Sequence, residues 1–199
     1  MGYNWRGFIT NTRKEIKTMK LYHGSETAGI KELLPQTSNH EKPLAYLTDN
    51  RALAVVYSHN YLPRPLGFFT YCWGKNHSLH YEEYFPGQIE LFYKGKKGYV
   101  YTAEIDGLTQ IEKMPWVYVS ETPVKVSSVE EIPDIYEELL RLHEAGEITL
   151  HFYEDLPHEY IASSEKIVKR EIENLKTNKN EIYENFLREH FPQLFGENE

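Results

Sequence analysis

The chain has 199 residues, of which 40% are hydrophobic and 26% are charged, and its formal net charge is −8 at pH 7. This composition is typical of a one-domain globular protein, and the acidic balance argues against a nucleic-acid partner, which usually binds a basic stripe. No apolar run is long enough to span a membrane, and the single cysteine excludes an intrachain disulfide framework. Because the N-terminus also lacks the apolar core of a signal peptide, a cytoplasmic protein is expected.

Residues 1–18 are polar and carry no periodic pattern. They are expected to form a flexible arm, or an upstream extension of a chain whose natural start is Met19. A single domain is then expected over residues 19–199.

The first half of the domain is expected to alternate short strands and helices. In chain order the pattern predicts a strand at 20–23, a short helix at 30–34 and a strand at 43–47. A longer helix is predicted next, with Thr48 or Asp49 as its cap and its end before Pro63. A strand at 68–73 follows it. The longer helix has an apolar stripe made of Leu53, Val56, Tyr57 and Tyr61. The stretch 74–97 that follows is polar and matches no pattern, and its cluster of three lysines is expected in a solvated turn.

The second half is expected to end in helices. Strands are predicted at 99–105, 116–120, 148–153 and 160–162, and a helix opened by Pro133 is predicted to end at Gly146. Helical spacing then extends from Ser163 to the C-terminal region and is interrupted at Asn178 and Asn180. Because the strands neither alternate regularly with helices nor arrive in even hairpins, the sequence predicts an α+β fold.

Three segments place a polar or aromatic residue at the end of a predicted strand, where a rigid scaffold can aim it into a site. They read LYHGS at 21–25, AYLTDNRALAVVYS at 45–58 and PHEYIASSEKI at 157–167. Taken singly, each has an ordinary structural interpretation: a histidine in a turn, two tyrosines in a core and a glutamate on an exposed edge strand.

Taken together and in this order, the segments resemble the ADP-ribosyltransferase superfamily, specifically the His-Tyr-Glu branch that contains diphtheria toxin and the poly-ADP-ribose polymerases. The first matches the branch's YHG[ST] strand through His23, Gly24 and Ser25. In the second, Tyr46 and Tyr57 have the spacing of the family's two tyrosines, with Asp-Asn and a helix between them. His-Glu-Tyr-Ile, which includes Glu159, matches the family's late strand.

The resemblance implies a mixed β core of split antiparallel sheets with flanking helices and a helical C-terminus. It also implies NAD as substrate, with cleavage of the nicotinamide–ribose bond and no metal. Glu159 would stabilise the oxocarbenium-like state, Tyr46 and Tyr57 would stack on nicotinamide, and Gly24 would let the backbone bond the carboxamide. The remaining members of the pocket would be His23, which would bond the adenosine-side ribose, and Ser25, which would assist.

Two positions depart from the family pattern. Ala54 stands where poly-ADP-ribose polymerases place a serine on the carboxamide, and Pro157 stands where arginine-directed transferases place an acidic residue or glutamine. A protein is expected as acceptor in preference to a nucleic acid, and arginine is disfavoured. The alternatives are an NAD glycohydrolase, a non-catalytic domain of this fold that binds a nucleotide or a partner, and a tRNA 2′-phosphotransferase, which the acidic balance and Glu159 disfavour.

One further group has the residue types of a metal site. His77 and His80, with Glu82 and Glu83 close behind, lack a third spaced partner, so a solvated loop is expected instead. Cys72 lies in an aromatic strand and is expected to be buried rather than nucleophilic.

Overall fold

The computed structural model describes the protein over residues 18–37, 42–59, 71–73, 78–106, 108–111 and 116–195. All but the last residue of the expected N-terminal arm, and the positions from 60 to 70 that include Tyr61 and Pro63, lie outside these ranges.

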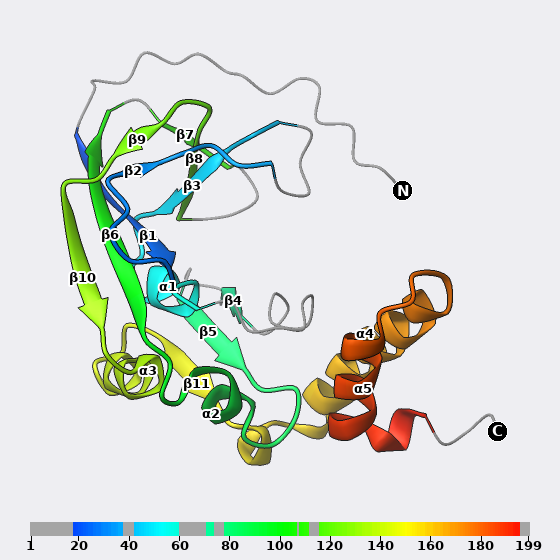
Figure 1. Cartoon of the computed structure of the whole chain (residues 1–199). Coiled ribbons are helices and arrows are strands. Elements are labelled where there is room, and N and C mark those ends of the chain that lie inside the picture. The colour runs from blue at the N-terminus through cyan, green and yellow to red at the C-terminus, as the bar shows by residue number, and fades with distance from the viewer. Residues whose placement is uncertain are drawn as a thin grey trace.

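The largest sheet of the described residues has six strands and lies on the left in Figure 1. Every neighbouring pair in it is antiparallel. In spatial order its strands are β10 (Ser128–Ile132), β6 (Gly98–Ile105), β1 (Met19–Ser25), β3 (Ala45–Thr48), β8 (Val117–Ser120) and β7 (Thr109–Gln110).

Two smaller sheets accompany it. The three-stranded sheet is mixed, because β5 (Leu79–Glu82) runs parallel to β11 (Thr149–His151) and antiparallel to β4 (Tyr71–Trp73). The third sheet is the antiparallel pair of β2 (Glu32–Leu33) and β9 (Val124–Lys125).

The described residues also form α-helices and short 3₁₀ turns. The helices are α1 (Arg51–Val56), α2 (Gln88–Tyr93), α3 (Ile135–Glu144), α4 (His158–Thr177) and α5 (Glu181–His190), and the 3₁₀ turns are η2 (Tyr153–Asp155) and η3 (Pro192–Leu194). The expected end of α3 is confirmed, since Gly146 follows it with a left-handed φ of 72°, but the helix begins two residues after the expected Pro133, with Asp134 as its cap. None of the helices in these ranges is long and apolar enough to cross a membrane.

Alternation along β1 divides the apolar side chains between two cores. Leu21 belongs to a small cluster on one face of the six-stranded sheet, with Leu33, Ala45, Leu47, Ala103, Tyr118 and Val124. Tyr22 packs against a larger cluster on the other face, which includes α1, α2, α3 and the C-terminal helices. Residues next to each other in β1 therefore face different surroundings.

The α+β class is confirmed, and so are most of the predicted strands and helices. Two of the predicted elements are wrong: the helix expected at 30–34 is absent, because the chain there forms β2, and the strand expected at 160–162 lies in the first turns of α4. The stretch 74–97, for which no element was predicted, contains β5 and α2, and its three lysines lie exposed in the turn after α2, as expected. The edge strand β10 was not predicted, because four of its five residues are exposed and give no apolar alternation.

Candidate functional site

His23 is held by the backbone of the neighbouring strand. Its Nδ1 lies 2.8 Å from the carbonyl oxygen of Tyr46. Since a carbonyl only accepts, Nδ1 carries the hydrogen, and the lone pair of the neutral ring is on Nε2. Burial lowers the pKa of His23 below its ordinary value, and the bond to Tyr46 opposes this shift only in part. At neutral pH the ring is therefore an uncharged acceptor at Nε2.

This bond forms where the pairing of β1 with β3 stops. The two strands share a single register pair, Tyr22 with Thr48. Extending the antiparallel register by two residues sets Gly24 opposite Tyr46, but there the Tyr46 carbonyl is taken by the His23 side chain instead. The first two segments of the family-like pattern thus meet at one point.

Gly24 lies directly beneath the last turn of α1. A Cβ added at Gly24 would stand 1.9 Å from the carbonyl oxygen of Ala54, 2.7 Å from the nitrogen of Ser58 and 2.8 Å from the carbonyl carbon of Tyr57. The space that any side chain would need is therefore filled by the helix backbone. Packing against α1 is a sufficient reason for glycine here, and the expected bond from Gly24 to a carboxamide stays a prediction.

The two tyrosines belong to the elements on which His23 and Gly24 pack. Tyr46 is half-buried in β3, and Tyr57 is the C-terminal cap of α1, where its N–H bonds the carbonyl of Leu53 at 3.2 Å. The ring of Tyr57 packs against the larger core. Burial is the main cause that raises the pKa of Tyr93 in that core, and the nearby Tyr57 adds to it.

The start of α1 differs from the prediction. Asn50 is the cap, and its Oδ1 accepts from the backbone N–H of Leu53 at 3.1 Å. Thr48 instead accepts from the N–H of Asn50, and Asp49 accepts from the Tyr118 hydroxyl at 3.1 Å. The Asp-Asn pair therefore fixes the turn between β3 and α1.

Ser25 closes β1 in a turn, where its Oγ accepts from the N–H of Thr27 at 3.2 Å. Directly after it, the Glu26 carboxylate lies 3.2 Å from Nδ1 of His59, which follows the end of α1. No local pattern in the sequence indicates this pair, because its members are far apart in the chain.

Glu159 is not placed beside these residues. It is the second residue of α4 and is exposed, in a first turn preceded by Pro157. In Figure 1, α4 and α5 project on the side of the molecule away from β1 and β3. The structure thus brings His23, Gly24, Ser25, Tyr46 and Tyr57 together and leaves Glu159 apart.

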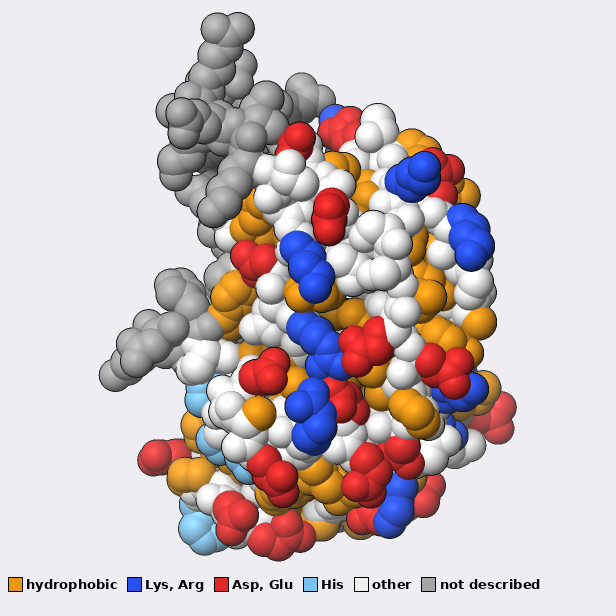
Figure 2. Space-filling model, turned by 90° about the vertical axis from the view of Figure 1, so that its left-hand side faces the viewer, with side chains coloured by type: hydrophobic (Ala, Val, Ile, Leu, Met, Phe, Trp, Pro, Cys, Tyr) orange, Lys and Arg blue, Asp and Glu red, His pale blue; other side chains and the backbone are white. Residues whose placement is uncertain are grey.

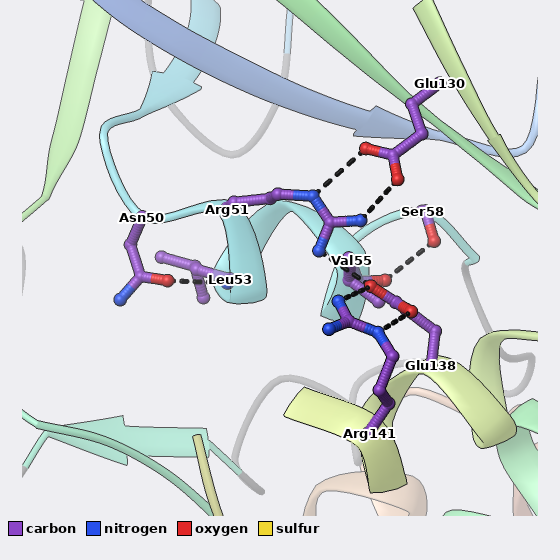
Figure 3. A network of polar contacts seen from close by, with 8 residues as sticks. All are labelled: Asn50, Arg51, Leu53, Val55, Ser58, Glu130, Glu138 and Arg141. Atoms are coloured by element: carbon purple, nitrogen blue, oxygen red, sulfur yellow. Dashed lines mark hydrogen bonds and ion pairs between the residues drawn. The ribbon is translucent and has the colours of Figure 1, made fainter. Parts of the chain in front are cut away.

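A network around Arg51 holds α1 in place (Figure 3). The guanidinium donates to both carboxylate oxygens of Glu130 on β10, at 3.0 and 2.6 Å, and to Glu138 on α3 at 2.7 Å. Arg141 bonds the same Glu138 carboxylate at 2.8 and 2.7 Å. Hydrogen bonds from Arg141 are the main cause that lowers the pKa of Glu138, with those from Arg51 adding to it. Local sequence gives no sign of this network, because Arg51 has no acidic partner in its own segment.

The histidine-rich segment after β4 forms part of the fold. Contrary to the solvated loop expected there, His80 lies in β5, and the buried Glu83 accepts from the N–H groups of Ile89 at 2.8 Å and Tyr153 at 2.9 Å. Nδ1 of His80 lies 2.9 Å from Nε2 of His151, and the two rings stack. Among the described residues no group of three or more His, Cys, Asp or Glu side chains could hold a metal ion. His77 and the side chain of Cys72 lie outside the described residues.

An open hollow of about 310 Å³ lies where β10 meets α3, and it differs in charge from a dinucleotide site. Its lining is dominated by carboxylates, among them Glu130, Asp134 and Glu137. A pyrophosphate would be repelled there. On the face shown in Figure 2, Lys and Arg side chains lie among Asp and Glu side chains.

Comparison of the chain with protein-family models, with curated protein sequences and with solved structures gave no match. The functional interpretation therefore depends on the motifs and on the geometry of the site.

Proposed function

We propose that the protein is an ADP-ribosyltransferase-like domain that binds NAD at His23, Gly24, Tyr46 and Tyr57 and cleaves the nicotinamide–ribose bond. With water as acceptor it is an NAD glycohydrolase, and with a protein as acceptor it is a transferase. The observation that carries the proposal is the hydrogen bond from His23 to the Tyr46 carbonyl, because it joins two motifs that are 23 residues apart.

The chemistry of these groups suits the ligand. With Nδ1 committed to Tyr46, the neutral His23 ring offers Nε2 to a hydroxyl donor such as a ribose. Aromatic rings at Tyr46 and Tyr57 can hold a flat nicotinamide by stacking, which is worth about 0.5–1.5 kcal/mol for each ring pair beyond the buried area. The Gly24 contact fixes the end of α1, and so the position of Tyr57, relative to β1.

A second candidate function is NAD binding without cleavage. It is favoured by the exposed position of Glu159 on α4, which puts the expected catalytic carboxylate on a different element from the other motif residues. The first candidate requires the exposed first turn of α4 to bring Glu159 to the bound ribose, and Glu159→Gln then lowers nicotinamide release by about 10²–10³-fold with little change in NAD affinity. Under the second, neither protein releases nicotinamide although both bind NAD.

Calorimetric titration with NAD tests the shared part of both candidates. We expect Tyr57→Ala to weaken binding by about 1–3 kcal/mol, the usual cost of losing a stacking aromatic. Tyr136→Ala is the matched control, since Tyr136 is a half-buried tyrosine on α3 outside the site. Melting curves of both variants separate lost binding from lost folding. Equal NAD affinity in the wild type and a folded Tyr57→Ala variant would contradict the proposal.

A further inference from the structure

The Glu26–His59 pair lies beside the proposed nicotinamide site. The peptide that joins Tyr57 to Ser58 packs against Gly24, and the chain continues from there by one residue to His59 and from Gly24 by two to Glu26. The two side chains close this junction with a contact of 3.2 Å between Oε2 of Glu26 and Nδ1 of His59.

Ser58 makes the junction rigid. It is fully buried, and its Oγ donates to the carbonyl of Val55 at 2.7 Å. Its side chain occupies the space over Gly98, where an added Cβ would come within 2.5 Å of Oγ and 2.7 Å of the Ser58 Cβ. The backbone that carries His59 is therefore fixed against both β1 and β6.

The Glu26–His59 pair has the features of a general base and its orienting carboxylate. Nδ1 of His59 faces the carboxylate and donates to it, so the lone pair of the neutral ring is on Nε2. Burial lowers the pKa of His59, nearby Lys96 lowers it further, and Glu26 opposes both. The side chain of His59 is 20% exposed, which leaves it accessible from solvent.

We propose that His59, oriented by Glu26, accepts the proton of the nucleophile that attacks NAD at this site; this inference rests on the proposed function. The nucleophile oxygen forms a bond to the anomeric carbon while the carbon–nitrogen bond breaks, and the bonding electron pair leaves with neutral nicotinamide. The proton of the nucleophile passes to Nε2 of His59. The products from water are nicotinamide, ADP-ribose and one proton.

This role specifies the class of acceptor. A base assists only a nucleophile that has a proton to lose, so the acceptor is a proton-bearing group such as water or a hydroxyl, and not an ionised carboxylate. It also assigns Glu26 as the positioning residue, which fixes the ring orientation and the tautomer of His59 as the acidic partner does in a catalytic triad.

Nicotinamide release from NAD in water, measured as kcat against pH, tests the inference. For the wild type we expect kcat to rise with pH as His59 loses its proton, and for His59→Gln a fall of about 10²–10⁴-fold with the inflection lost. Glu26→Gln should move the inflection to lower pH, because the charge that raises the His59 pKa is gone. Glu121→Gln, which breaks an exposed ion pair with Lys42, is the control and should match the wild type.

A folded His59→Gln variant with the rate and pH profile of the wild type would overturn the inference and leave the proposed function standing. If the inflection of kcat against pH is the same in Glu26→Gln as in the wild type, Glu26 does not act as the positioning residue of His59. NAD binding without nicotinamide release in the wild type would overturn the inference but not NAD binding. A wild type that does not bind NAD in calorimetry would overturn both.

Discussion

Glycine at position 24 is required for steric rather than conformational reasons. The approach of Ala54 O to within 1.9 Å of a Cβ position is far closer than real side chains tolerate, and the contacting atoms belong to backbone that cannot rotate away. Gly29 is the contrasting case, because an added Cβ there meets nothing within 4 Å but its φ is 75°. A side chain is therefore excluded at Gly24 by lack of space and disfavoured at Gly29 by the backbone conformation.

We expect Gly24→Ala to lower the free energy of unfolding by about 3 kcal/mol or more, since α1 must move off β1. Gly29→Ala should cost about 1 kcal/mol, the usual penalty for a side chain in the left-handed region. Urea denaturation of both variants measures the difference. An equal cost for the two would contradict the close packing of α1 on β1.

Glu138 gives a second test at the level of one residue. Its pKa is lowered from an ordinary 4.5, chiefly by Arg141 and then by Arg51. A lowered carboxyl pKa stabilises the folded protein above the unfolded pKa, and this contribution is lost as pH falls through the folded value. We therefore expect Glu138→Gln to destabilise the protein at pH 7 and this disadvantage to shrink progressively as the pH falls below about 4. Chemical denaturation at pH 7 and at low pH measures the difference in the free energy of unfolding between the wild type and the variant. A difference that does not depend on pH would exclude an ionised Glu138 in the network.

Among the elements, α1 is short and depends on others for its position. Six residues are too few for a stable isolated helix. It is held by burial of Leu53 and its neighbours, by the Asn50 cap, and by Arg51, which joins it to β10 and α3.

We expect Arg51→Gln to lower the free energy of unfolding by about 1–3 kcal/mol, the range for hydrogen bonds to charged groups. The lower part of the range applies to the Glu130 contact, because that carboxylate is 52% exposed. Lys42→Gln is the matched control: its ion pair is exposed at both ends and should contribute at most about 0.5 kcal/mol. Similar losses in both variants would show that the network does not hold α1.

Sequence alone predicted the elements whose pattern is local. The apolar spacing and Gly146 identify α3, and the strand predicted at 99–105 corresponds to β6. The link between His23 and Tyr46 was predicted only as membership of one site, through the family resemblance. Its hydrogen bond depends on the pairing of β1 with β3, which no local pattern specifies.

The start of α4 shows why the rest was missed. Tyr160 and Ile161 favour a strand by their propensity, and the family-like motif gave the same expectation. In the fold, however, α4 begins at His158, and its buried face is formed further along by Ser164, Val168 and Leu175. Tertiary packing overrides the local preference, and Glu159 is carried onto an exposed helical turn.

At the scale of the whole molecule, one buried cluster extends from α1 to α5. It contains Val55 on α1, and Phe186, Leu187 and Phe191 near the end of the described chain. Phe85, which follows β5, is the junction: its ring makes edge contacts with Phe186 and Phe191 and stacks on His190, with centroids 4.2 Å apart. Docking of α5 therefore depends in part on His190, whose ring can gain a proton.

His190 should make this docking sensitive to acid. Burial is the main cause that lowers its pKa from the ordinary 6.5, and Glu189 opposes the shift. Because the unfolded chain binds the proton more readily, the free energy of unfolding falls as pH drops from about 6.5 through the folded pKa. The lowered pKa values of His23, His59 and His151 act in the same direction, and the raised pKa of Glu83 acts in the opposite one.

Comparing the wild type with His190→Gln isolates the contribution of His190 to the pH dependence of stability, since the other titrating groups are common to both proteins. His190→Gln loses the stacking contact and should be less stable than the wild type at pH 7.5, by about 0.5–1.5 kcal/mol. At pH 5 the gap should narrow, because only the wild type still carries the cost of protonating a buried ring. His158→Gln, which replaces an exposed histidine on α4, is the control and should follow the wild type at both pH values. Urea denaturation gives the free energy of unfolding of each variant relative to the wild type at both pH values. A gap that widens at pH 5 would mean that the protonated ring binds Phe85 more strongly than the neutral one, and that docking of α5 resists acid.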